Sequence, residues 1–360
     1  MLTTLLFILP FLVFYTIVAV YAERKISAFM QDRLGPMEVG YYGILQTVAD
    51  LLKLLQKEDL VPAQANKFLF KAAPLIIFVP IFLGFSVLPL SAEWSFGFSS
   101  ALFFLLAIIS LDVIGIVIAG WASNNKYSML GTMRSVAQII SYEVPLSLAV
   151  LCVCVFTQSL DLQEISYQQS ILNTESVTPL FGIKGLPDVA AVGGFLTWNV
   201  FRMPALFFVW IIFFIASLAE SNRAPFDLPE AESELVAGYQ TEYSGFRWAV
   251  IMLAEYAMML LVSFVGVILF WGSWSTPLPN IGSIALADWT TGQPGTFALH
   301  LWGIFWLVFK TFTLVAIQIW VRWTYPRIRI DQLTSLSWKF LTPLAFVLLL
   351  MCALWKLWLL

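Results

Sequence analysis

The 360-residue sequence predicts an all-α integral membrane protein with eight transmembrane helices and an amphipathic helix on the cytoplasmic surface. Hydrophobic residues make up 60% of the chain and charged residues 11%, whereas soluble domains contain about 45–50% and about 25%. Aromatic residues reach 16% and include 15 Trp. The chain also contains apolar runs of roughly 20 residues, the length at which a helix crosses a bilayer.

The apolar runs divide one polytopic membrane domain, residues 1–360, into its expected elements. No internal repeat is visible, which disfavours the inverted-repeat architecture of many transporters. The eight expected spans are roughly 2–22, 70–90, 101–120, 138–158, 203–220, 247–271, 300–322 and 340–359.

Basic residues orient these spans. Most Lys and Arg lie in the loops after the first, third, fifth and seventh spans, whereas the opposite loops contain only Lys184 and Arg202. Because cytoplasmic loops are enriched in Lys and Arg, we expect the odd-numbered loops inside and both termini outside.

Residues 43–58 in the first cytoplasmic loop predict a helix too short to span a membrane. Its polar and apolar side chains separate onto two stripes, so we expect it to lie at the membrane surface, either as an anchor or over a lipid-facing cavity. The polar stripe contains Gln46, Asp50, Lys53 and Lys57, and the apolar one Ile44, Val48, Leu51, Leu52 and Leu55.

Ionisable residues inside the spans are candidate functional groups, because charges are costly there and are usually retained for a role. We expect them to gather between the cytoplasmic surface and the midplane, where Lys310 can neutralise only one acid. The pattern predicts a proton path, with structural ion pairing as the alternative. The residues are Asp112, Glu143, Glu220, Glu255 and Lys310.

An acidic loop, residues 221–246, follows the fifth span on the side expected to be basic. Crowded carboxylates alter one another's proton affinity, which suits proton uptake; ordinary solvated loop charges are the alternative. Its acids between Ser221 and Gly245 are Asp227, Glu230, Glu232, Glu234 and Glu242, against Arg223 alone.

Cysteine and histidine counts argue against a redox centre in this chain. The three Cys lie in apolar stretches, and Cys152 and Cys154 point about 200° apart on a helix. An Fe–S cluster needs about four thiolates, and bis-histidine haem ligation needs more than His300. We therefore expect no metal site, and a formal charge of −3 gives no reason to expect nucleic acid.

Several strings resemble the quinone-site membrane subunit of respiratory complex I, the NADH-quinone oxidoreductase of respiratory chains. They include AERK at 22–25, QDRLGP at 31–36 and AESNRAPFDLPE at 219–230. The remaining matches fall at 45–50, 57–58, 122–128, 134, 141–145, 232–238, 242–243, 322, 326–327, 331–333 and 338–339.

The resemblance implies a subunit that walls a quinone tunnel where the hydrophilic arm meets the membrane arm, with no catalytic redox group of its own. Quinone is then the substrate, FMN and Fe–S clusters belong to partner subunits, and the location is the bacterial cytoplasmic membrane, in contact with lipid. Tunnel or entrance residues would be Arg24, Arg33, Asp50, Phe226 and Arg322. The proton or charge relay would contain Glu143, Glu220, Asp227, Glu230, Glu232, Glu234 and Glu255, with Asp112 and Lys310 as further candidates.

Three questions stay open at this level. A related membrane subunit occurs in membrane-bound hydrogenases and ferredoxin-fed complexes, and an ion-coupled secondary transporter would also bury acids. Arg33 could bond a carbonyl, Asp32 or a lipid phosphate. The external segment 159–202 is longer than the family pattern and could contact a partner or form a mobile loop.

Overall fold

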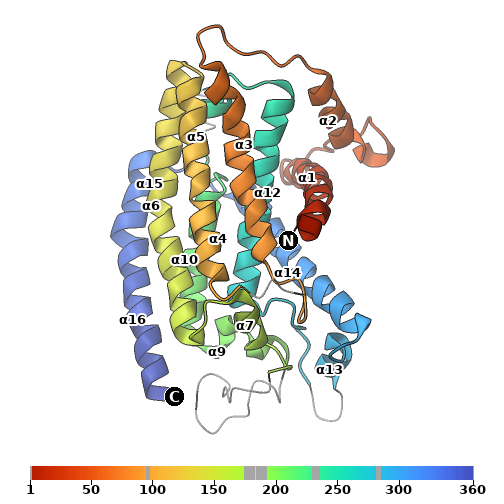
Figure 1. The fold of residues 1–360 in the computed structure, drawn as a ribbon, viewed down its shortest axis with the longest axis vertical. Coiled ribbons are helices and arrows are strands. Elements are labelled where there is room, and N and C mark those ends of the chain that lie inside the picture. Colours follow the sequence, from red (N-terminus) through yellow and green to blue (C-terminus); the bar gives the residue numbers. More distant parts are fainter. Residues whose placement is uncertain are drawn as a thin grey trace.

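A computed structural model describes residues 2–94, 98–173, 183, 193–228, 236–280 and 285–359. Within these ranges the regular structure is entirely helical. The longer helices stand mostly side by side along the long axis of the molecule, whereas α1 and α14 cross them obliquely (Figure 1). The all-α prediction is therefore confirmed.

The long helices match the apolar runs of the sequence. Seven spans are long and apolar enough to cross a membrane: 7–30, 67–87, 101–122, 126–157, 245–270, 297–324 and 330–358. The helices that form them are α1 (Leu2–Met30), α3 (Lys67–Gly84), α4 (Ala101–Ile109), α5 (Leu111–Ala122), α6 (Lys126–Thr157), α12 (Gly245–Phe270), α14 (Phe297–Thr324), α15 (Ile330–Leu336) and α16 (Thr342–Leu359).

The expected fifth span is α10 (Pro204–Glu220), an apolar helix of 17 residues. At 1.5 Å per residue it is roughly 26 Å long, slightly shorter than a hydrocarbon core of about 30 Å. The count of eight spans therefore stays a prediction.

Two helix boundaries differ from the sequence-based ranges. Helix α1 continues to Met30 and α6 begins at Lys126, because polar residues extend a helix beyond its apolar part. The third span is divided at Ser110 into α4 and α5, and Asp112 lies in the first turn after the break.

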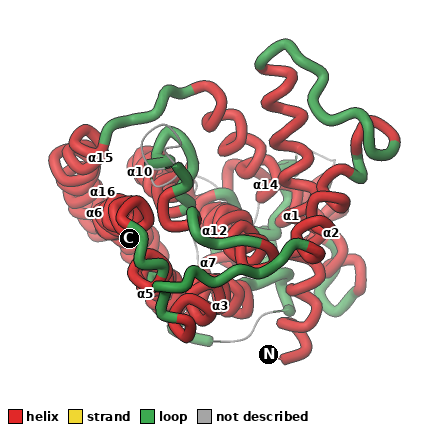
Figure 2. The backbone as a smooth tube through the Cα atoms, turned by 90° about the horizontal axis from the view of Figure 1, so that it is seen from above, coloured by secondary structure: helices red, strands yellow, loops and turns green. Residues whose placement is uncertain are grey.

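Helix α12 forms the centre of the bundle. Seen from above, it lies among α3, α10 and α14 (Figure 2). In its apolar window 89% of the residues are buried inside the chain, compared with 28% for the span that contains α16. The buried polar groups that α12 contacts are therefore held by the best-packed helix.

Glycine permits a close backbone approach between α6 and the short helix η5 (Gly238–Gln240). A Cβ at Gly131 would lie 2.6 Å from the Cα atom of Gly238, closer than real Cβ contacts allow. Only glycine at position 131 lets η5 pack so tightly, and this contact fixes the position of Tyr239.

The segment 43–58, predicted to form a surface helix, contains helix α2 (Gln46–Gln56), between α1 and the loop before α3. Three residues of its apolar stripe are about half exposed in the isolated chain: Ile44, Leu52 and Leu55. Leu51 is partly buried against the chain, as are Val48 and Leu54. The rest of the chain thus covers only part of the apolar stripe. The placement of this helix in the membrane surface stays a prediction.

The first part of segment 159–202, predicted to be external, is attached to the end of α12. It contains α7 (Leu162–Tyr167) and, after residues outside the described ranges, α9 (Asn199–Arg202). The Gln169 amide donates to the Ile268 carbonyl at 2.9 Å and accepts from the Asn199 and Gly272 backbone amides. These bonds close the lower end of the bundle, where α7, α9 and α13 (Leu286–Thr291) lie (Figure 1).

Candidate functional site

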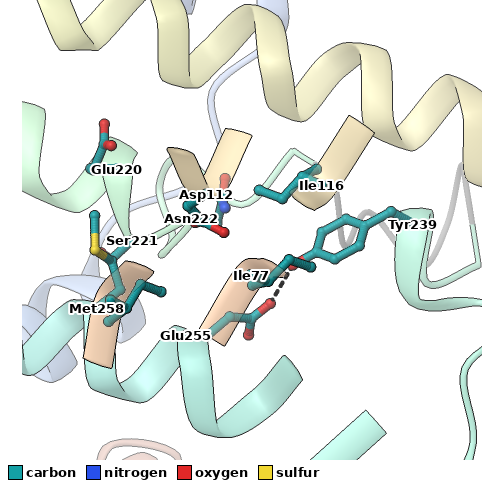
Figure 3. A pocket seen from close by; sticks show the side chains of 10 residues that line it. Ile77, Asp112, Ile116, Glu220, Ser221, Asn222, Tyr239, Glu255 and Met258 are labelled. Carbon is teal, nitrogen blue, oxygen red and sulfur yellow. Dashed lines mark hydrogen bonds between the residues drawn. The ribbon is translucent and has the colours of Figure 1, made fainter. Parts of the chain in front are cut away.

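Three acids from three helices line one small pocket: Asp112 of α5, Glu220 of α10 and Glu255 of α12 (Figure 3). Asp112 and Glu220 are buried. The cavity volume is about 10 Å³, room for about one water molecule and too little for an organic ligand. The pocket is therefore suited to a proton or a water.

The three acids differ in the hydrogen-bond partners of their carboxyl oxygens. Glu255 Oε1 accepts a hydrogen bond from the Tyr239 hydroxyl at 2.9 Å and another from Gln240 Nε2 at 2.5 Å. Glu220 Oε2 and Asp112 Oδ1 are buried without a hydrogen-bond partner among the residues that the structure describes. A buried carboxyl oxygen without a donor is costly unless a proton or water satisfies it.

The acids also influence one another. Glu143 of α6 and Asp112 both interact electrostatically with Glu220. When several carboxyl groups interact, the protonation of one alters the proton affinity of the others. Protonation of one of these acids therefore affects its neighbours, and the proton path that the sequence pattern indicates stays a prediction.

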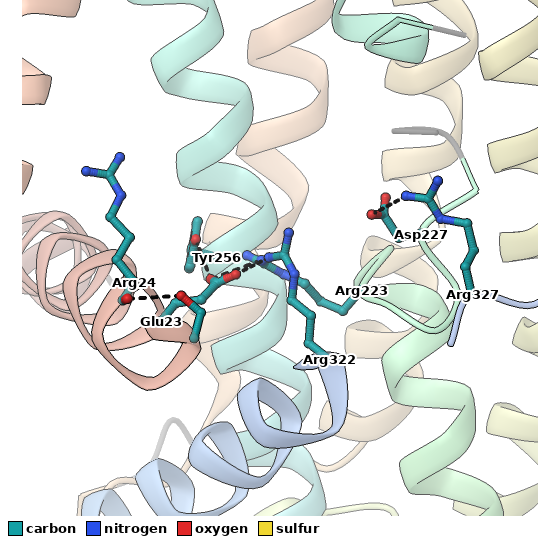
Figure 4. Close-up of polar contacts among 8 residues, drawn as sticks. Glu23, Arg24, Arg223, Asp227, Tyr256, Arg322 and Arg327 are labelled. Atoms are coloured by element: carbon teal, nitrogen blue, oxygen red, sulfur yellow. Dashed lines mark hydrogen bonds and ion pairs between the residues drawn. The ribbon is translucent and has the colours of Figure 1, made fainter. Parts of the chain in front are cut away.

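A second group, the Glu23 cluster, consists of Glu23, Arg223, Arg322 and Tyr256 (Figure 4). Arg223 Nη1 lies 3.3 Å from Glu23 Oε2, and Arg322 also forms an ion pair with the Glu23 carboxylate. The Tyr256 hydroxyl donates to Glu23 Oε2 at 2.6 Å, and its ring lies 4.2 Å from Arg223 Cζ. Buried Glu23 thus joins α1, α12, α14 and the loop after α10.

The two groups meet on α12. Glu255 reaches the acid pocket, whereas the next residue, Tyr256, reaches Glu23. Consecutive helix residues project about 100° apart, which lets one helical turn serve both groups. The Glu23 cluster is therefore a neighbour of the acid pocket, and a change of charge in the cluster would take place next to the pocket.

Most of the expected tunnel residues lie around the Glu23 cluster. Arg24 Nη1 pairs with Asp50 Oδ2 at 2.5 Å, which links α1 to α2. Phe226 is buried against the Tyr142 ring, with centroids 5.2 Å apart. Arg33 is exposed, and its Nε donates to the side-chain amide oxygen of Gln31, Oε1, at 2.8 Å.

Asp227 of the acidic loop forms an ion pair with Arg327, with Arg327 Nη2 3.0 Å from Asp227 Oδ2 (Figure 4). Burial raises the pKa of the Asp227 carboxyl, and the positive charge of Arg327 opposes that shift. The expected relay residues Glu230, Glu232 and Glu234 lie outside the described residues.

Lys310 is not part of the acid pocket, contrary to its expected position beside the acids. Its ammonium donates to the backbone carbonyls of Trp271, Ser273 and Ser275 at 2.6–3.0 Å, beyond the far end of α12. Glu255 lies 16 residues before Trp271, about 24 Å along a helix. Asp112 and Lys310 are therefore not an ion pair.

Sequence reasoning did not assign Glu23, Arg223, Tyr256 and Tyr239 to the site. In the sequence, Glu23 and Arg223 are charged residues near the ends of spans, where the sequence alone does not distinguish a solvated side chain from a buried one. Glu23 pairs with Arg223 across 200 positions and with Arg322 across 299, and neither pairing has a local signal in the sequence. Among the described residues, no three His, Cys, Asp or Glu side chains are grouped so that they could hold a metal ion.

Comparison with known proteins identifies the family of this chain. The sequence model described as NADH dehydrogenase matches residues 2–353. The chain is 56% identical to an NADH-quinone oxidoreductase H subunit of Cytophaga hutchinsonii over 98% of both chains. It is 51% identical to the NADH-quinone oxidoreductase H subunit of Chlorobium luteolum, over 97% of this chain and 87% of that protein. The chain therefore belongs to the NADH dehydrogenase family, among the H subunits of NADH-quinone oxidoreductase, and is a membrane-embedded component of that enzyme complex.

Proposed function

We propose that this chain walls the quinone-binding tunnel with the hydrophilic arm and couples quinone reduction to proton translocation through its buried carboxylates. The names of its relatives point to NADH as the electron donor. Electrons would pass through FMN and Fe–S clusters in partner subunits, as the family resemblance implies. This chain would contribute binding surface and titratable groups, and no redox centre.

The quinone side of the proposal rests on the residues around the end of α1. Arg24, Asp50 and Arg322 present charged groups there, and Phe226 presents a buried aromatic ring. A quinone head group has few polar atoms, so a largely apolar tunnel with a few hydrogen-bond donors suits it. Arg33, exposed beyond the end of α1, would shape the entrance.

The coupling side rests on one observation, the adjacency of Glu255 and Tyr256 on α12. Quinone reduction consumes protons, so the charge near the tunnel changes during turnover. In the proposal, this change of charge perturbs the Glu23 cluster. Tyr256, which donates a hydrogen bond to Glu23, is next to Glu255 in the sequence, so the perturbation reaches Glu255. Glu255, Asp112, Glu220 and Glu143 then shift their protons in response, each altering the affinity of its neighbour.

The topology completes the proposal. The Glu23 cluster and the acidic loop would face the cytoplasm, where the hydrophilic arm docks, and both termini would lie outside the bacterial cytoplasmic membrane. Asp227, Glu230, Glu232 and Glu234 would extend the relay, which passes to the other membrane-arm subunits.

Replacement of Glu220 by Gln tests the coupling, because Gln keeps the shape and removes the titration. We expect Glu220→Gln to assemble into a complex of normal size, to keep NADH oxidation by a hydrophilic artificial acceptor, and to lose most quinone reduction and proton pumping. Glu220→Asp retains more of both.

The matched control is Glu164→Gln, at the opposite end of the bundle, where Glu164 accepts a hydrogen bond from Ser159. It should pump normally. Wild-type pumping per electron in Glu220→Gln would reject the relay role of Glu220.

A further inference from the structure

Two cations contact the ring of Phe156 at the end of the bundle farthest from α2, where the C-terminus lies (Figure 1). Phe156 is the penultimate residue of α6. Arg202 Cζ, at the end of α9, is 5.1 Å from the ring centroid, and Lys356 Nζ, near the end of α16, is 5.6 Å from it. Three separate elements therefore bring two positive charges to one aromatic side chain.

Neither charge is neutralised by the part of the chain that the structure describes. Arg202 is buried, and Nη1 donates only to neutral acceptors, the Gln168 carbonyl at 3.0 Å and Asn199 Oδ1 at 3.4 Å. Its Nε–H is buried and has no acceptor within the described ranges. Lys356 is half-buried and takes part in none of the ion pairs among the described residues.

The two charges also repel each other. Burial lowers the pKa of Arg202 to about 10, so the guanidinium stays charged at neutral pH. The negative face of the Phe156 ring offsets part of this charge, but a ring supplies no hydrogen-bond acceptor for the ammonium or for Nε–H. An oxyanion supplies both a counter-charge and acceptor oxygens, and Arg and Lys bind phosphate in this way.

The surroundings favour a phosphate that is part of a lipid. Lys356 is followed by Leu357 and Trp358, which are 80% and 90% exposed. Exposed leucine and tryptophan at the end of a membrane span sit where acyl chains meet head groups. A free phosphate would gain nothing from these side chains, whereas an anionic phospholipid covers them with its acyl chains.

We propose that Arg202 and Lys356 bind the phosphate of an anionic phospholipid at this end of the bundle. The half-buried ammonium of Lys356 meets the phosphate directly, and the buried charge of Arg202 holds it from beneath. The bound lipid would neutralise both cations and pack the ends of α6, α9 and α16 together.

The test uses the purified, delipidated complex in nanodiscs of phosphatidylcholine with a small fraction of phosphatidylglycerol. Lipid that stays bound after re-extraction is counted per complex by mass spectrometry. We expect Lys356→Gln to hold one phosphatidylglycerol about fivefold more weakly, the effect of one basic residue at a membrane surface. Lys356→Arg should retain it, and Lys339→Gln, an exposed lysine near the other end of the same helical segment, should not alter it.

Arg202→Gln should weaken retention in the same direction; if that variant fails to assemble, the half-buried Lys356 alone decides the result. Equal phosphatidylglycerol retention by Lys356→Gln and the wild type overturns the proposal. In a second arm, radiolabelled inorganic phosphate is added to complexes in pure phosphatidylcholine. Phosphate binding that Lys356→Gln abolishes, without any preference for phosphatidylglycerol, overturns the lipid assignment.

Discussion

Glu23 and Arg223 form a buried ion pair, 3.3 Å between Oε2 and Nη1, although 200 positions separate them in the sequence. Each is less than one-tenth exposed. The pair ties the C-terminal part of α1 to the loop after α10, and Arg322 and Tyr256 bind the same carboxylate. Removal of one partner from such a network leaves buried charge uncompensated.

Glu23→Ala should therefore destabilise the assembled complex by about 3–5 kcal/mol, the usual cost of deleting one partner of a buried ion pair. The measurement is the temperature at which quinone reductase activity is lost. Glu23→Gln, which still accepts a hydrogen bond from Tyr256, should lose less. Glu38→Ala, at an exposed position, serves as the control. Thermal midpoints for Glu23→Ala and Glu38→Ala that coincide would show that the network contributes little to stability.

Arg33→Ala tests the quinone entrance. Arg33 is exposed beyond α1, and the hydrogen bond that its side chain forms within the described residues goes to Gln31, so loss of the side chain should leave the fold intact. We expect quinone reduction to slow several-fold, while NADH oxidation by a hydrophilic acceptor continues at the wild-type rate. Lys67→Ala removes an exposed charge at the first residue of α3 and should alter neither rate. An equal loss of both activities in Arg33→Ala would indicate failed assembly instead.

Leu52→Lys tests whether the exposed part of the α2 stripe is covered in the assembled membrane complex. Leu52 is 53% exposed in the chain alone, so within this chain the lysine costs little. If lipid or a partner covers Leu52, a charge there costs about 2–3 kcal/mol or more. We expect a lower yield of complete complex, whereas Gln46→Lys, on the polar stripe, should assemble normally. Wild-type yield and activity for Leu52→Lys would place this face of α2 in water.

Lys310→Met separates a structural role from a proton-relay role. The ammonium donates to three carbonyls beyond the C-terminal end of α12, where a positive charge also complements the helix dipole. Its loss should destabilise the complex by about 2–3 kcal/mol, as for other hydrogen bonds from a charged group. Pumping per electron should stay near the wild-type value. Reduced pumping with an unchanged thermal midpoint would assign Lys310 to the relay.

Asp227→Asn tests the pH dependence that follows from burial of this carboxyl. Burial raises its pKa in the folded protein, despite the opposing charge of Arg327. Its contribution to stability is therefore fully present below the unfolded pKa and is lost as pH rises through the higher folded pKa. The Asn variant lacks this titration, so its thermal midpoint should rise relative to the wild type as pH increases. A relative decrease would show that the ion pair with Arg327 outweighs burial.

The positions of the membrane helices were predictable because the requirement is local. In lipid, each segment must satisfy its own backbone hydrogen bonds, so length and apolar composition reveal a span wherever it packs. Seven of the expected runs are long apolar helices, and the eighth is the shorter α10. Length and apolar composition did not predict the break at Ser110 or the full length of α6, because both depend on what surrounds the helix.

Sequence also identified the acids of the pocket, because a carboxylate inside an apolar run is conspicuous wherever it finally points. Only the tertiary structure decided which charges meet. In the structure, Asp112, Glu220 and Glu255 line one pocket. Glu23 forms ion pairs with two arginines far along the chain, and Lys310 lies at the opposite end of α12. The physical reason is that a partner depends on helix rotation, tilt and close contacts such as Gly131 against Gly238, and these arise from packing over the whole bundle.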